Sequence, residues 1–313
     1  MSMSLKTHAI SAAAIAGILS WSIVTTTAQR GQGAGDQPQG GAAAQGGRGG
    51  RGQRGPQLPP AGPAPRLPNG KPDLSGHWGE PYTPNMAGRG GVLDPQTRQP
   101  LVFARQGEMV APASPDGAAA RTFDLPYTEW GLKKWKDYDP VRDGEYTASC
   151  LPFGMSRNVN SPHGVQVIQN NDAVAFLWEQ NNWFTFVPTN GMKWPEDLPR
   201  AWTGMSTGRW DGDTLIVETT GFNGYTRLDT VGHPHSKDAK MINTFLRTDS
   251  NTIQHTVTIH DPKTFTQDWM NVRTWRIKPA NDVIMEYACE ENNLENLFNG
   301  VIKPWKAPDN VDD

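Results

Sequence analysis

The sequence predicts a mainly β domain: an antiparallel meander forming a barrel-like or sandwich domain, with an extended N-terminal arm and one short helix. Three observations predict it. From Val165 onward, short runs rich in Val, Ile, Thr, Phe and Trp alternate with polar turns. Asp211-Gly212, between two such runs, is typical of a tight β-hairpin turn. The absence of a glycine-rich βα turn argues against a Rossmann-like fold.

Residues 1–28 have the pattern of a signal peptide. Lys6 supplies positive charge, Ala9 to Val24 are mainly apolar, and Thr27-Ala28 forms a small-residue cleavage site. Polar residues interrupt the apolar run, and a bilayer span needs about 20 mainly apolar residues. We therefore expect removal of this segment, no stable membrane span afterwards, and a periplasmic or secreted protein. A segment kept as an anchor is the alternative.

Residues 29–66 are almost entirely Gly, Gln, Ala, Arg and Pro, which predicts a disordered linker because there is little to bury. Its arginines are compatible with RNA binding, but a tether fits an exported chain better. Residues 67–313 fit a single β-rich domain. The net charge of −3 gives no strong field, so no nucleic-acid partner is expected.

The domain is expected to begin with an arm that is rich in Gly and Pro and runs to Pro126, anchored by Leu74, Trp78 and residues 101–103. Thr128 to Tyr138 is the best helix candidate, because Thr128 can cap it and Trp130, Leu132 and Trp135 form a partial apolar stripe. Strands are expected at 165–168, 173–178, 183–187, 209–210, 214–219, 241–247, 252–260, 271–277 and 283–289.

Tryptophan and cysteine each allow two interpretations. Twelve tryptophans either build a core of large side chains or line a pocket for a small apolar or aromatic molecule. An even cysteine count in an exported chain favours a bridge between Cys150 and Cys289, with two buried thiols as the alternative. The absence of a CxxC spacing excludes a cysteine-based zinc site.

The loop from Asp229 to Ser236 is the strongest candidate for chemistry. Asp229 would orient His235 and make it more basic, with Ser236 as a hydrogen-bond donor. His163 could join only through the fold. The competing interpretation is that these groups satisfy the loop's own backbone. His233 and His235 supply only two local ligands, so no metal is expected.

Several motifs together resemble a family of exported bacterial proteins, mostly labelled hypothetical: PDLSGHW (72–78), CLPFGMSR (150–157), GRWDGDTLIVETTGF (208–222), GHPHS (232–236), DPKTFT (261–266) and EYACEEN (286–292). The resemblance covers nearly the whole chain after the linker and implies export and one compact domain, without an assigned activity. The matching positions are Arg157, Trp210, Asp213, Asp229, His235, Ser236, Asp261 and Trp269, and both cysteines, which supports their bridging.

The chain departs from this pattern in two places. Relatives tend to read ERFRR where this chain has Asn243 to Arg247, and GFNDKTWLD where it has Gly224 and Arg227. Any chemistry that depends on the Glu of that pattern is therefore not expected of this chain.

Two functions follow from these observations. The first is a non-catalytic exported module that binds a small apolar or aromatic molecule in a Trp-rich pocket. The residues expected to contact that ligand are Trp210, Ser236, His233, Arg157 and Trp269. The alternative is a hydrolase or proton-transfer enzyme using Asp229, His235 and His163. No cofactor is expected in either case.

Overall fold

The computed structural model describes residues 58, 60–88, 91–113 and 119–308. The predicted signal peptide and the predicted linker up to residue 57 lie outside the described residues. The chain divides into two units, Met1–Gln53 and Arg54–Asp313, and only the second contains described residues. Within the described ranges, every helix is too short or too polar to span a lipid bilayer.

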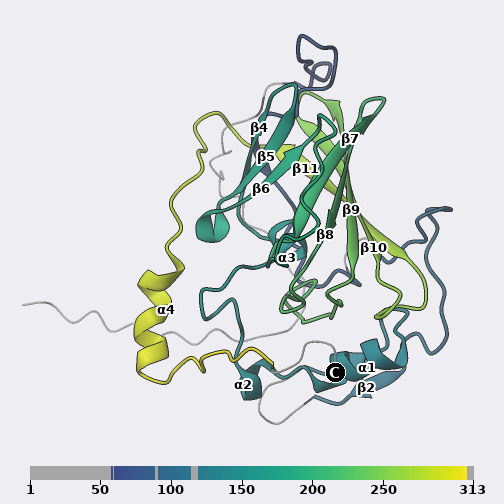
Figure 1. The fold of residues 1–313 in the computed structure, drawn as a ribbon, viewed down its shortest axis with the longest axis vertical. Helices are drawn as coiled ribbons and strands as arrows, with labels where there is room; N and C mark the ends of the chain where they lie inside the picture. Colours follow the sequence, from purple (N-terminus) through teal and green to yellow (C-terminus); the bar gives the residue numbers. More distant parts are fainter. Residues whose placement is uncertain (1–57, 59, 89–90, 114–118, 309–313) are drawn as a thin grey trace, which may run out of the picture. The chain divides into compact units, whose positions relative to one another are not determined.

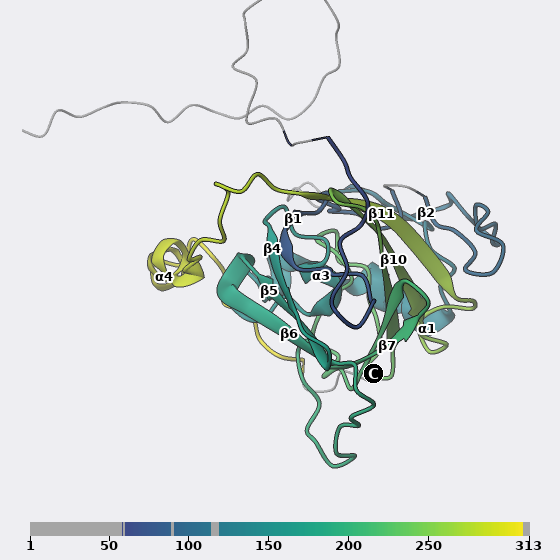
Figure 2. The ribbon, with the colours of Figure 1, turned by 90° about the horizontal axis from the view of Figure 1, so that it is seen from above.

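The fold is built on a nine-stranded antiparallel sheet that curls until it nearly closes into a barrel (Figure 1 and Figure 2). This confirms the predicted fold class. The strands in chain order are β1 (Gly76–Gly79), β4 (Val165–Gln169), β5 (Ala173–Trp178), β6 (Trp183–Pro188), β7 (Met205–Asp211), β8 (Thr214–Thr220), β9 (Lys240–Asp249), β10 (Thr252–His260) and β11 (Trp269–Ile277). Their order across the sheet is β6-β5-β4-β1-β11-β10-β9-β8-β7. A separate ribbon pairs β2 (Met109–Ala111) with β3 (Arg121–Thr122).

Sequential hairpins account for most of the strand order. Alternate residues of β5 and β8 are buried, as expected for strands with one face on a core. In the β7–β8 hairpin Asp211 pairs with Thr214, so Gly212 and Asp213 form the turn, one residue later than predicted. Gly212 has a φ of +56°, a conformation that glycine adopts at little cost.

The predicted arm contributes a strand to the middle of the sheet. β1 lies between β4 and β11, and Trp78 is paired with both Val165 and Ile277. Leu74 and Leu101 are buried, as expected of anchors. Contacts with the sheet begin ahead of Leu67, because Arg66 forms an ion pair with Asp213 at 2.6 Å.

The two edge strands, β6 and β7, come together without pairing. Among the ladders of the described residues, none joins them. A β-carbon on Gly208 of β7 would lie 2.7 Å from Cγ1 of Val187 and 2.9 Å from Cγ2 of Thr189. We call this contact the β6–β7 seam. Glycine at position 208 therefore lets β6 and β7 approach closely enough for the barrel to close almost completely.

Aromatic rings fill the barrel. Phe176 and Phe245 lie 4.9 Å apart, and Trp275 packs edge-on against Trp178 at 6.3 Å between ring centres. Figure 2 shows the short helix α3 (Met155–Asn158) inside the ring of strands, and all four of its residues are buried. Tryptophans thus build the core, one of the two interpretations that the sequence left open.

Further helices lie outside the barrel. They are α1 (Glu129–Asp137), α2 (Pro140–Asp143), α4 (Cys289–Phe298) and the short 3-10 turn η1 (Gln180–Asn182). The predicted helix is confirmed as α1, with Oγ1 of Thr128 accepting a hydrogen bond from the Gly131 amide at 3.1 Å. Gly131 is needed because a β-carbon there would collide with the carbonyl oxygen of Thr264.

The predicted strand at 283–289 is wrong. Residues 283–288 form no strand, and α4 begins at Cys289. β11 is already paired on both sides, so the chain that leaves it finds no sheet edge. Instead, the side-chain amide of Asn182 donates to the Tyr287 carbonyl at 3.0 Å and accepts from the Tyr287 amide at 3.3 Å.

Cys150 and Cys289 form a disulfide with their Cα atoms 5.6 Å apart, as the sequence predicted. The bond ties the first turn of α4 to the segment before α3. The amide of Trp305 also donates to Oγ of Ser149 at 3.0 Å. Two attachments therefore hold the C-terminal segment, residues 278–308, against residues 144–155.

Candidate functional site

Asp229 is fully buried and pairs with His233, not with His235. Its Oδ2 accepts from His233 Nδ1 at 2.5 Å and from the Met86 amide at 2.8 Å. Its Oδ1 accepts from the amides of Gly232 and His233. The expected contact between Asp229 and His235 is therefore wrong. The carboxylate organises the loop instead.

His233 lies between two carboxylates. Its second ring nitrogen, Nε2, is 2.9 Å from Oδ2 of Asp124, and the Trp135 ring covers it at 4.5 Å. Burial by itself lowers the pKa of His233, but Asp229 and Asp124 outweigh burial and raise this pKa to about 10. The imidazole is thus a buried cation with both of its N–H groups engaged.

His235 lies in the same loop with different partners. Nδ1 is 2.8 Å from the Ser236 carbonyl oxygen, and Nε2 is 2.6 Å from Oγ1 of Thr226. A carbonyl only accepts, so Nδ1 donates and Nε2 accepts from the threonine. Burial lowers the pKa of His235, in keeping with a neutral ring. Neither nitrogen remains available for proton transfer in this geometry.

Ser236 is held by Asp261. Its hydroxyl donates to Oδ1 at 2.8 Å and its amide donates to Oδ2 at 2.7 Å. The same carboxylate accepts from Oγ1 of Thr264 at 2.6 Å. Two segments that the family resemblance singled out, 232–236 and 261–266, are thereby joined.

The other predicted site residues lie apart from one another. Trp269 is buried against Phe265, and Trp210 is half-buried on β7. His163 packs edge-on against Tyr287. Catalytic roles for Asp229, His235 and His163, and ligand contacts by Trp210, Ser236, His233 and Trp269, stay predictions.

Arg157 is buried behind the surface in an ion pair with Glu145 at 2.6 Å. Its guanidinium carbon lies 5.2 Å from the centres of both the Tyr146 and Phe153 rings. The hydroxyl of Tyr138 donates to Glu145 at 2.7 Å. Burial, then the Glu145 charge, raises the pKa of Tyr138, so this hydroxyl stays a donor.

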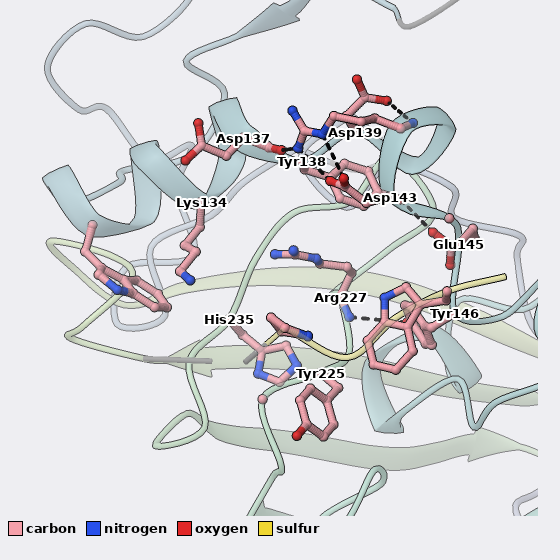
Figure 3. Close-up of a pocket in the computed structure, with 16 residues that line it drawn as sticks. Lys134, Asp137, Tyr138, Asp139, Asp143, Glu145, Tyr146, Tyr225, Arg227 and His235 are labelled. Atoms are coloured by element: carbon pink, nitrogen blue, oxygen red, sulfur yellow. Dashed lines mark hydrogen bonds and ion pairs between the residues drawn. The ribbon is translucent and has the colours of Figure 1, made fainter. Parts of the chain in front are cut away.

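A cleft of about 240 Å³ opens beside Glu145 (Figure 3). We call it the aromatic cleft. It is lined by the aromatic residues Trp130, Tyr138, Tyr146, Tyr225 and Trp305, the charged residues Lys134, Asp137, Asp139, Arg142, Asp143, Glu145 and Arg227, and Gly144, Gly224, His235 and Pro308. Four parts of the chain meet there: the end of α1, α2 with residues 144–146, the loop at 224–235, and the C-terminal segment.

Trp305 closes one side of the aromatic cleft. Its ring centre lies 6.3 Å from that of Tyr146, 5.6 Å from that of Tyr225 and 5.8 Å from that of Trp202. Rings with edge-to-face contacts at these spacings form a stable aromatic wall. The Ser149 contact and the nearby disulfide hold this wall in place.

Most acidic groups of the aromatic cleft already have partners. Glu145 pairs with Arg157, and Asp143 pairs with Arg142 at 2.6 Å. Asp139 caps α2 by accepting from two of its backbone amides. Among the described residues, Arg227 forms no ion pair and its guanidinium forms no hydrogen bond. It stacks on the Tyr138 ring at 5.1 Å.

Three other hollows are larger but less distinctive. One of about 700 Å³ near Ile277 and Pro279 is mainly apolar, one of about 360 Å³ borders Asp124 and Trp135, and one of about 350 Å³ borders Trp183. The described residues contain no group of three or more His, Cys, Asp or Glu side chains that could hold a metal ion. Of these four hollows, the aromatic cleft is the one that combines an aromatic wall with a guanidinium that forms neither an ion pair nor a hydrogen bond within the described residues.

Sequence reasoning anticipated only His235 among the residues that line the aromatic cleft. Tyr138, Tyr225 and Trp305 come from separate segments, and no local pattern connects them. One signal existed: Arg227 is one of the positions where the chain departs from the motif pattern that it resembles.

Comparison with known proteins adds no identification: no family model, curated protein or solved structure matches this chain.

Proposed function

We propose that the domain binds a small aromatic or apolar molecule in the aromatic cleft. The observation that carries the proposal is the lining of five aromatic side chains contributed by separate segments. Ligand sites are typically apolar and aromatic, with a few polar groups that fix orientation. Arg227 and the Tyr138 hydroxyl are such groups here.

The volume of the aromatic cleft limits the ligand. About 240 Å³ exceeds the roughly 150 Å³ of an apolar cavity that takes up benzene. It is below the roughly 300–1,000 Å³ of pockets for drug-sized molecules. A molecule with one or two fused rings fits these limits.

Binding of 2-naphthamide, a neutral two-ring compound, tests the proposal. At about −0.3 kcal/mol for each of its roughly 13 non-hydrogen atoms, a dissociation constant on the order of 1 mM or lower is expected. Ligand-observed NMR titration would measure it. Trp305→Ala removes one wall of the cleft and should weaken binding at least about tenfold.

Phe298→Ala is the matched control, because Phe298 is exposed on α4 in the same C-terminal segment. Its affinity for 2-naphthamide should equal that of the unchanged protein. Absence of saturable binding to the unchanged protein, or equal binding by Trp305→Ala, would contradict the proposed function.

The alternative, an enzyme acting through the loop at 229–236, receives less support. Both ring nitrogens of His235 are engaged, and Asp229 is committed to His233 and three backbone amides. His163 packs on Tyr287, apart from both. A base with a free nitrogen within reach of a ligand is missing from this arrangement.

We also propose that the protein is exported to the periplasm or secreted. The signal-like sequence of residues 1–28 supports this, and a disulfide is typical of oxidising compartments. Isolation of the protein from cells with both thiols open to alkylation would contradict export.

A further inference from the structure

We propose that the ligand of the aromatic cleft is an aromatic carboxylic acid whose carboxylate is bound by Arg227. This inference rests on the proposed function and narrows it from aromatic molecules in general to one chemical class. It assigns to Arg227 the role of the residue that determines specificity.

Arg227 is fixed in place before any ligand arrives. Its backbone amide donates to the Tyr146 hydroxyl at 3.2 Å, and its guanidinium stacks on the Tyr138 ring at 5.1 Å. Figure 3 shows its side chain reaching across the cleft between Tyr138 and His235. Little rotamer entropy remains to be lost when an anion binds.

Arg227 forms no ion pair within the described structure. Its side chain is half-buried, and no carboxylate of the described residues lies within ion-pair distance of it. The nearby carboxylates of Glu145 and Asp143 form ion pairs with other arginines. Asp137 is exposed at the rim. His235, directly below in Figure 3, is a neutral ring with both nitrogens engaged, so the floor supplies no countercharge.

The geometry of a guanidinium favours a carboxylate. Two parallel N–H groups match the two carboxylate oxygens, and the shared plane is compatible with continued stacking on Tyr138. The amide groups at the start of α2 do not compete for the anion, because the Asp139 side chain already accepts from them. A single unpaired guanidinium beside aromatic walls is therefore complementary to an aromatic ligand that carries one negative charge.

A pair of nearly isosteric probes isolates this interaction. 2-Naphthoate carries the carboxylate, and 2-naphthamide replaces it with a neutral amide of the same shape. Unchanged protein should bind the acid at least about tenfold more tightly than the amide in NMR titrations at neutral pH. Arg227→Met should remove this preference, so that the acid binds no more tightly than the amide, and Arg227→Lys should retain part of it.

Arg209→Met is the control for net charge, since Arg209 is exposed on β7. It should keep the full preference for the acid. Equal binding of acid and amide by the unchanged protein would overturn the inference and leave the proposed function intact, and so would an undiminished preference in Arg227→Met. Binding of neither probe would overturn both. If Arg227→Met does not fold, the comparison of the two probes on the unchanged protein remains decisive.

Discussion

His233 is the residue on which the loop at 229–236 depends. A buried imidazolium joins Asp229, at the base of the loop, to Asp124, which precedes α1, and Trp135 of α1 covers the ring. Removing one partner of such a group leaves buried charge uncompensated, which costs about 3–5 kcal/mol. The role supported by these contacts is to hold the loop and α1 together.

The charge of His233 predicts a pH dependence of stability. Its pKa is raised to about 10 in the folded protein and is about 6.5 in an unfolded chain, so folding takes up a proton between these values. The stabilisation is complete below pH 6.5 and is lost as pH rises through 10. From pH 7.5 to 9.5 the free energy of unfolding should fall by about 2–3 kcal/mol from this group.

Urea denaturation at both pH values measures the fall, and His233→Gln should lack this contribution. His260→Gln is the control, because His260 is exposed in its pair with Asp268. A His233→Gln protein with the same pH slope as the unchanged protein would refute the assignment of the proton to His233.

The sequence alone does not show which of the two histidines pairs with Asp229. Crowding of histidines around a carboxylate was predictable from the spacing of residues 229–236. Residues two apart point to opposite sides of an extended chain, so only one histidine can face Asp229. The left-handed turn at Gly232, with φ of +93°, directs His233 and not His235 toward Asp229. The local sequence alone does not specify that turn.

Among the elements, the C-terminal segment adds no strand to the sheet and is held by the disulfide and by hydrogen bonds, including those that join Lys278 and Asp282 to His77 of β1. The disulfide anchors α4, and Trp305 completes the wall of the aromatic cleft. Strands from 165 to 277 were predictable because they are short runs rich in β-branched and aromatic residues between polar turns, and several, such as β5 and β8, alternate inward and outward residues. The segment at 283–288 has a similar composition but meets no free edge, and pairing partners are not visible in a local pattern.

Removal of the disulfide should release this segment. A bridge between residues 139 apart stabilises by about 5 kcal/mol in the loop-entropy model. Cys150→Ser with Cys289→Ser should therefore lower Tm by roughly 10–20 °C. Limited proteolysis should then cut within residues 278–308 first.

Adding a reductant should lower the Tm of the unchanged protein and expose the same segment to proteolysis. It should change neither property of the double variant. An unchanged Tm and an unchanged cleavage pattern after complete reduction would show that the disulfide does not hold the segment.

For the whole molecule, near closure of the barrel places two unpaired edges side by side at the β6–β7 seam. Eight of the nine strands expected from residue 165 onward are present, and the barrel-like outcome was predictable. The position of β1 and the aromatic cleft were not, because each depends on segments more than eighty residues apart meeting in space, such as Trp78 with Val165 and Tyr138 with Trp305.

Substitution at the seam tests its tightness. Gly208→Val would force its branched side chain against Val187 and Thr189, and overpacking of this kind costs about 1–3 kcal/mol. Urea denaturation should show a lower midpoint for Gly208→Val. Gly62→Ala is the control, since a β-carbon at that position would meet no heavy atom within 4 Å. Equal midpoints for Gly208→Val and the unchanged protein would mean that the seam is loose.

The central place of β1 has a kinetic consequence. Its four residues leave the ribosome early, yet one of their two neighbours, β11, ends at Ile277. Until that late strand is synthesised, the sheet consists of separate hairpins with an open gap between them. Pairings so distant along the chain make folding slow and leave partly assembled hairpins prone to aggregation. For the export that we propose, such a delay would keep the chain unfolded until it is translocated.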